Sequence, residues 1–138
     1  MNKLYNTMSV RNVDRGFFEM PPLGFNLLIT GGQPIIITAK IINNSGIVSM
    51  NIPSFSTTTS TISALSTTIP YTFTKPSSTI TYSFQILVSI NGVVSNAQAS
   101  LRLSDGLLTF YADEVGGLFQ SGSTCGLATP INLIYNIA

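Results

Sequence analysis

The fold of this chain is decided by residues 79–109, which read TITYSFQILVSINGVVSNAQASLRLSDGLLT. Apolar and polar residues alternate over the first twelve positions, with Leu87 as the one exception. One face of this segment carries only apolar side chains, namely Ile80, Tyr82, Phe84, Ile86, Val88 and Ile90. A period of two residues is typical of a β-strand with one buried face. The pattern therefore predicts a strand over residues 79–90.

Two dipeptides predict turns that reverse the chain within this stretch. Asn91-Gly92 suits the turn type whose twist matches an antiparallel hairpin. The return strand alternates again, with an apolar face of Ala97, Ala99, Leu101 and Leu103 and a polar face of Gln98, Ser100 and Arg102. Asp105-Gly106 gives a second hairpin signal before the strand pattern resumes over 107–111. We therefore expect three consecutive antiparallel strands.

Further strands are expected at regular spacing on both sides of this unit. The segments are 25–30, 34–42, 47–52 and 130–137, with turns at Gly31-Gly32 and at 43–46. The expected inner residues are Val48, Met50 and Ile52 in one strand and Ile131, Leu133, Tyr135 and Ile137 in the last. We expect the last strand to be tied into a sheet, so that it does not tolerate truncation. About eight strands without an amphipathic helix predict an all-β protein, an antiparallel β-sandwich of jelly-roll topology.

The segment 53–68 is compositionally biased, because eleven of its sixteen residues are Ser or Thr. Such a composition is compatible with a disordered insert or an O-glycosylated stalk. Threonine is β-branched and favours strands, and Phe55, Ile62 and Leu65 offer apolar anchors. We expect a strand and a loop inside the domain. The segment 69–74 then leads into a turn at 75–78, and a glycine-rich connection follows Ala112.

The charge of the chain is low and balanced. Only 8% of the residues are charged and the net charge is +1, which leaves little to bind a nucleic-acid backbone. The most apolar run, 34–42, is interrupted by Thr38 and Lys40, so no transmembrane helix or membrane insertion is expected, and the N-terminus does not resemble a secretory signal. No charged residue lies in 41–74 or in 115–138. Such a surface favours an extracellular or virion protein, one that buries much of itself in an oligomer, or both.

Residues 1–24 differ from the rest of the chain. They show no helical stripe and no strand pattern, and Pro21-Pro22 and Gly24 close them off. We expect an N-terminal arm, linker or attachment segment over 1–24, with a frayed terminus as the alternative, and a β-sandwich head domain over 25–138.

The residue inventory argues against catalysis. The chain contains no histidine, which removes Ser-His-Asp and Cys-His chemistry and the commonest zinc ligand. The carboxylates are Asp14, Glu19, Asp105, Asp113 and Glu114. Asp113 and Glu114 are adjacent and would point apart in a strand, so we expect a loop tip, whereas a glycosidase needs two carboxylates facing each other. Asp105 is explained as the first residue of its turn. We therefore expect no enzyme, no catalytic residue, no cofactor and no metal site, and the sequence names no binding residue.

Three smaller features also have ordinary structural readings. The glycines at 116–117 and 122–126 lack the spacing and the lysine of a phosphate loop, so we interpret them as loop glycines. Cys125 is expected to be a small buried side chain, with an interchain bridge or a reactive thiol as alternatives. Asn43-Asn44-Ser45 matches a glycosylation sequon in an expected turn, which matters only on a secretory route.

Three sequence features together carry a resemblance. They are GIVSMNIP at 46–53 before a Thr/Ser-rich strand, Ile69-Pro70 followed by Lys75-Pro76-Ser77, and the ending that runs from Asn91-Gly92 through ASLRLSDGLLTFY at 99–111 and GLF at 117–119 to the last strand. This pattern over 25–138 resembles the C-terminal heads of trimeric phage tail fibres and of fibre or fibril proteins of large DNA viruses. Their broad architecture is similar to C1q and tumour-necrosis-factor heads. Residues 1–24 carry no collagen-like or coiled-coil repeat, in which they depart from the family pattern, and the family supplies no fixed binding residues to transfer.

The resemblance implies a function without catalysis. It implies a virion protein, a homotrimeric jelly-roll head that attaches to a host-surface receptor or glycan, or to another virion component. In such a trimer we expect outward side chains such as Leu87 or Tyr111 to be buried between copies. One alternative is a purely structural capsid or fibre-coat subunit without a receptor. A further alternative is a carbohydrate-active jelly-roll enzyme that depends on Asp113 and Glu114.

Overall fold

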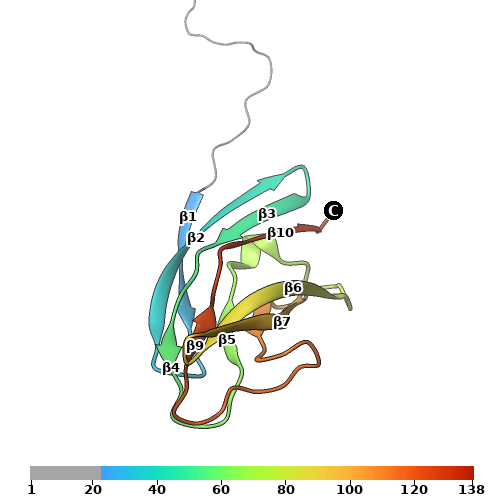
Figure 1. The fold of residues 1–138 in the computed structure, drawn as a ribbon. Helices are drawn as coiled ribbons and strands as arrows, with labels where there is room; N and C mark the ends of the chain where they lie inside the picture. The colour runs from blue at the N-terminus through green and yellow to red at the C-terminus, as the bar shows by residue number, and fades with distance from the viewer. Residues whose placement is uncertain (1–22) are drawn as a thin grey trace, which may run out of the picture.

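The computed structural model describes residues 23–138 of the chain, so the expected arm over 1–24 lies almost wholly outside the described residues. This part folds into two antiparallel sheets that pack face to face (Figure 1). The strands are β1 (Leu23–Ile29), β2 (Ile35–Asn44), β3 (Ile47–Ile52), β4 (Thr57–Thr58), β5 (Leu65–Thr68), β6 (Thr81–Ile90), β7 (Val93–Arg102), β8 (Leu107–Phe110), β9 (Thr124–Leu127) and β10 (Ile131–Asn136). Within residues 23–138 the single helical element is one 3₁₀ turn, η2 (Tyr71–Phe73). The all-β sandwich expected from the sequence is confirmed.

The strand pairing explains the jelly-roll character. One sheet has the order β1-β2-β3-β10 and the other the order β4-β9-β6-β7-β8-β5. Within this arrangement β3 pairs with β10, β4 with β9, β5 with β8 and β6 with β7, all antiparallel. These nested pairs form one long antiparallel ribbon of eight strands that folds over itself, as in a jelly roll. The β1–β2 hairpin then extends the smaller sheet beyond β3.

The β6–β7 hairpin follows the sequence pattern closely. Asn91 and Gly92 both have positive φ, at 51° and 84°, which is the conformation of the turn predicted for them. Ten residue pairs follow from this turn, from Ile90 opposite Val93 to Thr81 opposite Arg102. The expected inner residues of β7 are all buried. In the first strand Ile86 and Val88 are buried, and Tyr82, Phe84 and Ile90 are partly buried against the core. Ile80 is different, because it precedes β6 and is 50% exposed.

The core lies between the two sheets. Val48, Met50 and Ile52 of β3 are fully buried, as their alternation predicts, and they face the inner residues of β6 and β7. Tyr135 of β10 is buried as well and donates its hydroxyl to the carbonyl of Phe73 at 3.0 Å. Burial raises the pKa of the Tyr135 phenol well above its usual range.

The β1–β2 turn closes one side of the sandwich. Thr30 forms a bridge with Ser66 of β5, and Gln33 donates its main-chain N–H to the carbonyl of Thr58 of β4 at 2.8 Å. This turn therefore occupies both edge strands of the six-stranded sheet, which would otherwise present unpaired main-chain groups. Gly31 permits the approach, because a Cβ at this position would lie 2.1 Å from the carbonyl oxygen of Ala64.

The Thr/Ser-rich segment forms two short strands and a loop inside the domain, as expected. Leu65 is fully buried there, but the expected anchor Ile62 is wrong, because its side chain is 59% exposed in the β4–β5 loop. The glycine-rich connection also contains a strand, β9, which the sequence did not predict. Gly126 of β9 lies so close to the neighbouring chain that a Cβ would be 2.0 Å from the carbonyl oxygen of Phe55. A glycine in this strand therefore marks close backbone approach and not a loop.

Smaller differences concern the turns and the strand count. The turn expected over 43–46 is shorter, because β2 continues to Asn44 and only Ser45 and Gly46 reverse the chain. Four residues, 103–106, join β7 to β8, so Asp105 lies late in this loop. The described residues hold ten strands where about eight were expected.

Cys125 is buried, as expected. Within residues 23–138, no helix has the length and apolar character needed to cross a membrane.

One buried hydroxyl generates a stability prediction. Thr67 of β5 is 4% exposed, and its hydroxyl oxygen has no hydrogen-bond partner among the described residues. Replacing it by valine (Thr67→Val) keeps the shape and removes an unsatisfied polar group, which we expect to stabilise the fold by about 1 kcal/mol. Thermal unfolding should then shift upward by about 4 °C.

The matched control is Thr59→Val, at a threonine that is equally buried. The hydroxyl of Thr59 donates to the carbonyl of Gln120 at 2.6 Å and accepts from the N–H of Ser123 at 3.3 Å. Its removal should lower stability by about 1–2 kcal/mol. Equal effects of the two substitutions would contradict the assignment of an unsatisfied hydroxyl to Thr67.

Candidate functional site

The outer face of the six-stranded sheet is lined by neutral polar side chains. Gln85 of β6 lies directly opposite Gln98 of β7, and Ser83 lies opposite Ser100. These side chains point outward because their neighbours in each strand, such as Ile86 and Ala97, are buried in the core. Alternation thus supplies a surface of amides and hydroxyls next to an apolar interior.

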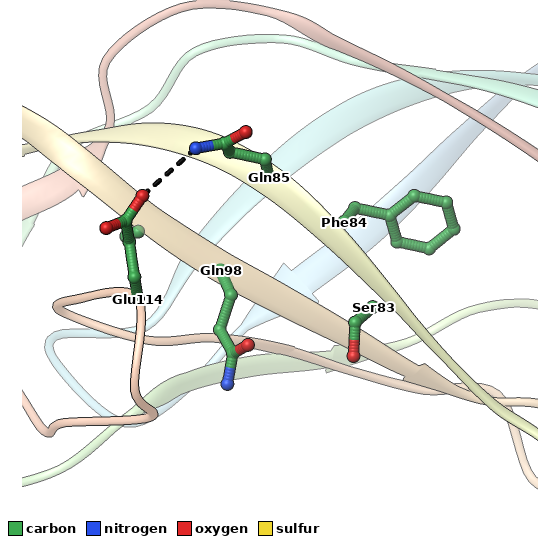
Figure 2. A pocket seen from close by; sticks show the side chains of 6 residues that line it. Ser83, Phe84, Gln85, Gln98 and Glu114 are labelled. Atoms are coloured by element: carbon green, nitrogen blue, oxygen red, sulfur yellow. Dashed lines mark hydrogen bonds between the residues drawn. The ribbon is translucent and has the colours of Figure 1, made fainter.

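A loop after β8 rises over this polar surface and forms a hollow. Beyond β8, the N–H of Tyr111 donates to the carbonyl of Gln98 at 3.0 Å, and the N–H of Gln98 donates to the carbonyl of Asp113 at 3.1 Å. The loop closes on itself where the N–H of Ala112 donates to the carbonyl of Gly117 at 2.8 Å. The space between loop and sheet is a hollow of ≈ 190 Å³. Its walls are Ser83, Phe84, Gln85, Ala97, Gln98 and Glu114 (Figure 2).

Asp113 holds the shape of this loop. One oxygen of its carboxylate accepts hydrogen bonds from the N–H of Val115 at 2.9 Å and from the N–H of Gly117 at 2.7 Å. A carboxylate that accepts two main-chain donors is a strong local staple. A side chain at Gly117 would collide with this carboxylate, because a Cβ there would lie 2.2 Å from its second oxygen. The glycine-rich turn is therefore built around the carboxylate of Asp113. Its main-chain N–H groups donate hydrogen bonds to this carboxylate and are not free to bind an external anion.

Glu114 has a different position from its neighbour. Its carboxylate extends to Gln85 and accepts a hydrogen bond from the side-chain amide at 3.0 Å (Figure 2). The loop tip expected for these two acids is confirmed, but their side chains diverge, one into the loop and the other towards the sheet. Gln98 lies below the loop, and its amide nitrogen would be 3.5 Å from a Cβ at Gly116.

The hydrogen-bonding capacity of the hollow is largely unused within residues 23–138. In this part of the chain, the side-chain amide of Gln98 and the hydroxyl of Ser83 make no hydrogen bond, and the second oxygen of Glu114 makes none either. A side-chain amide offers two hydrogen-bond donors and an acceptor oxygen. A hydroxyl can donate one hydrogen bond and accept others, whereas a carboxylate only accepts. Tyr111 does not line the hollow, but its half-buried aromatic side chain lies on the same outer face, because Phe110 before it is buried. The set can bind a neutral molecule that is rich in hydroxyl groups.

Asp105 does not contribute to this hollow. Its carboxylate pairs with the guanidinium of Arg102, from which it accepts hydrogen bonds at 3.0 Å and 2.5 Å. The bonds to Arg102, together with the N–H of Leu107, lower the pKa of Asp105 to about 2. Both side chains are exposed, so the pair secures the β7–β8 loop and adds little to global stability. Among residues 23–138 no group of three or more acidic or sulfur-bearing side chains could hold a metal ion.

Two other hollows flank the β1–β2 turn and are larger. One of ≈ 260 Å³ lies against Leu28 and the outer part of β5, and one of ≈ 450 Å³ lies between Gln33 and Ser60. In the second, the hydroxyl of Thr59 donates to the carbonyl of Gln120, whereas the side chains of Gln33, Thr58 and Ser60 make no hydrogen bond within the described residues. The smaller hollow under Glu114 differs from both by placing two amides beside a carboxylate, although sequence reasoning named none of its residues as ligands.

Comparison with known proteins does not add a family to this geometry. A scan against protein-family models and a search of curated proteins gave no match for the chain. The case for function therefore depends on the residues themselves.

The different positions of Asp113 and Glu114 generate a prediction. Asp113→Ala removes an acceptor of two main-chain hydrogen bonds, so we expect a loss of about 1 kcal/mol in unfolding free energy. Glu114→Ala removes an exposed contact and should change stability by less than about 0.5 kcal/mol. Chemical denaturation of both variants measures the difference. A larger loss for Glu114→Ala than for Asp113→Ala would reverse the two roles.

Proposed function

We propose that this protein is a non-enzymatic head of the viral or phage fibre type, which assembles as a homotrimer in the virion and attaches to a glycan on the host surface. The observation that carries the proposal is the hollow under Glu114. It combines two planar amides, a hydroxyl and one carboxylate on a rigid sheet surface. Sugars are recognised through such groups, because each vicinal pair of hydroxyls donates and accepts at the spacing of a planar amide or carboxylate.

The charge of the hollow narrows the class of glycan. Glu114 is its only charged side chain among the lining residues, and that charge is negative. A sialic acid or a sulfated sugar would bring a second negative charge next to this carboxylate, which costs free energy. The proposed ligand is therefore a neutral hexose or N-acetylhexosamine, whose hydroxyls can donate to Glu114 and whose apolar ring face can pack near Tyr111.

A glycan array tests the proposal with the full chain as the probe. We expect binding to neutral glycans and at least tenfold weaker binding after Gln98→Ala or Glu114→Ala. Gln33→Ala is the matched control, since Gln33 is an exposed glutamine in the β1–β2 turn and is held there through its main-chain N–H. It should bind like the unmodified protein.

Three results would count against the attachment role. Failure of the assembled, folded protein to bind any glycan or host cell would leave a purely structural coat subunit as the better reading. Strong preference for sialylated glycans would contradict the role of Glu114. Binding that survives both substitutions in the hollow would place the ligand elsewhere.

A further inference from the structure

The outer face of the four-stranded sheet carries exposed aliphatic side chains at positions where a solvated sheet normally has polar ones. The strongly exposed members are Leu28 (52%), Ile36 (68%), Ile47 (51%) and Ile134 (64%). They alternate with core residues, so they point away from the other sheet. The outer face of the six-stranded sheet is different, since Ser, Thr, Gln and Asn occupy most of its central positions.

Three isoleucines of this face form one contiguous patch. Ser49 of β3 lies between Ile42 of β2 and Ile134 of β10, because it pairs with both. Ile47, two residues before Ser49 on β3, is a diagonal neighbour of each, at about 7–8 Å. We call Ile42, Ile47 and Ile134 the isoleucine cluster. Side chains at this spacing can be covered together by one partner surface.

Two of the polar residues beside the cluster are already paired with each other. The amide of Asn51 donates to the amide oxygen of Asn132 at 2.9 Å across β3 and β10. Lys40 is the only charged residue in the strands of this sheet. Burying hydrogen-bonded amides costs much less than burying unpaired ones. The face can therefore be desolvated at a modest cost.

The cluster adjoins an open sheet edge. Strand β10 pairs with β3 alone, and the N–H of Ile137 donates to the carbonyl of Gly46 on that side. Main-chain groups alternate in direction along a strand, so those of Asn132, Ile134 and Asn136 point to the opposite edge. There the Tyr82 hydroxyl donates to the carbonyl of Asn136 at 3.4 Å, and the main-chain groups of Asn132 and Ile134 have no partner within the described residues. No charged residue or proline lies within β10, although such residues commonly protect an edge strand.

A second copy of this chain fits the face best. The strands span roughly 20 Å by 20 Å, or about 400 Å² of flat area, before side-chain relief and the β10 edge are added. A standard interface buries about 800 Å² on each partner, so the flat face supplies about half of that area and side-chain relief and the β10 edge must supply the rest. A nearly uncharged surface also meets its own copy without repulsion, which a surface of one sign could not do.

We infer that copies of this chain meet at the isoleucine cluster and the β10 edge. That three copies assemble rests on the proposed function. The position differs from the sequence expectation, which placed Leu87 or Tyr111 between copies. Both residues lie half-buried on the outer face of the other sheet, next to the glycan hollow. Assembly through the four-stranded sheet leaves that hollow open to a ligand.

Light scattering behind a sizing column tests the interface with the full chain. The unmodified protein should have a mass near three times 14.7 kDa, about 44 kDa. Ile134→Lys should shift the protein to the single-chain mass and raise the dissociation constant at least 100-fold. Val94→Lys is the matched control, since Val94 is 55% exposed and faces outward on the six-stranded sheet. It should remain assembled.

The outcomes separate this inference from the proposed function. If the Ile134→Lys variant still assembles, the proposed interface is wrong and the attachment role is unaffected. If the unmodified protein has the mass of a single chain at micromolar concentration, both the interface and the trimer are wrong. Ile134→Asn provides a milder variant that matches the neighbouring Asn132 and Asn136 if the lysine prevents folding. It should raise the dissociation constant at least tenfold, and no change would count against the interface. Glycan binding by a folded single chain with a mutated cluster would confirm that the two surfaces are independent.

Discussion

The register of the β6–β7 hairpin is the constraint on which the rest of the sandwich depends. Asn91 and Gly92 both adopt positive φ, and this turn fixes every pair from Ile90 with Val93 to Thr81 with Arg102. A shift by one residue would exchange the buried face for the polar one. If β6 kept its buried face, Gln98 and the other polar residues of β7 would then lie in the core. The same turn therefore sets the hydrophobic core and the row of amides that lines the hollow.

The elements with a clear period of two could be predicted from the sequence, because alternation there reports burial directly. Val48, Met50 and Ile52 are all buried as expected, and β10 is tied into the sheet by the buried residues that its alternation named. The prediction of strands failed where the main chain of one strand packs directly against the main chain of another, without side chains between them. Gly126 looked like a loop residue, yet it sits in β9 because the carbonyl of Phe55 leaves no room for a Cβ.

The candidate site was harder to predict for a different reason. Gln85 and Gln98 are far apart in a linear reading, and only the hairpin register shows that they are opposite each other. Glu114 joins them because the carboxylate of Asp113 folds the loop, a local interaction that an adjacent acid pair does not reveal. The sequence did contain one indication of the site, since one glutamine lies among the smaller polar residues on the outer face of each of the strands β6 and β7.

The two outer faces of the sandwich have opposite chemistry, and this contrast connects assembly with ligand binding. Both faces lack the dense charge that keeps most small domains soluble. The isoleucine cluster gains free energy when it is covered, because exposed aliphatic area is removed from water. The amides under Glu114 would instead lose their bonds to water unless a partner replaced each of them. An apolar partner is therefore favoured on the four-stranded sheet, and only a ligand rich in hydroxyl groups is favoured in the hollow. A protomer that used its faces the other way round would bury unsatisfied amides and leave its isoleucines in solvent.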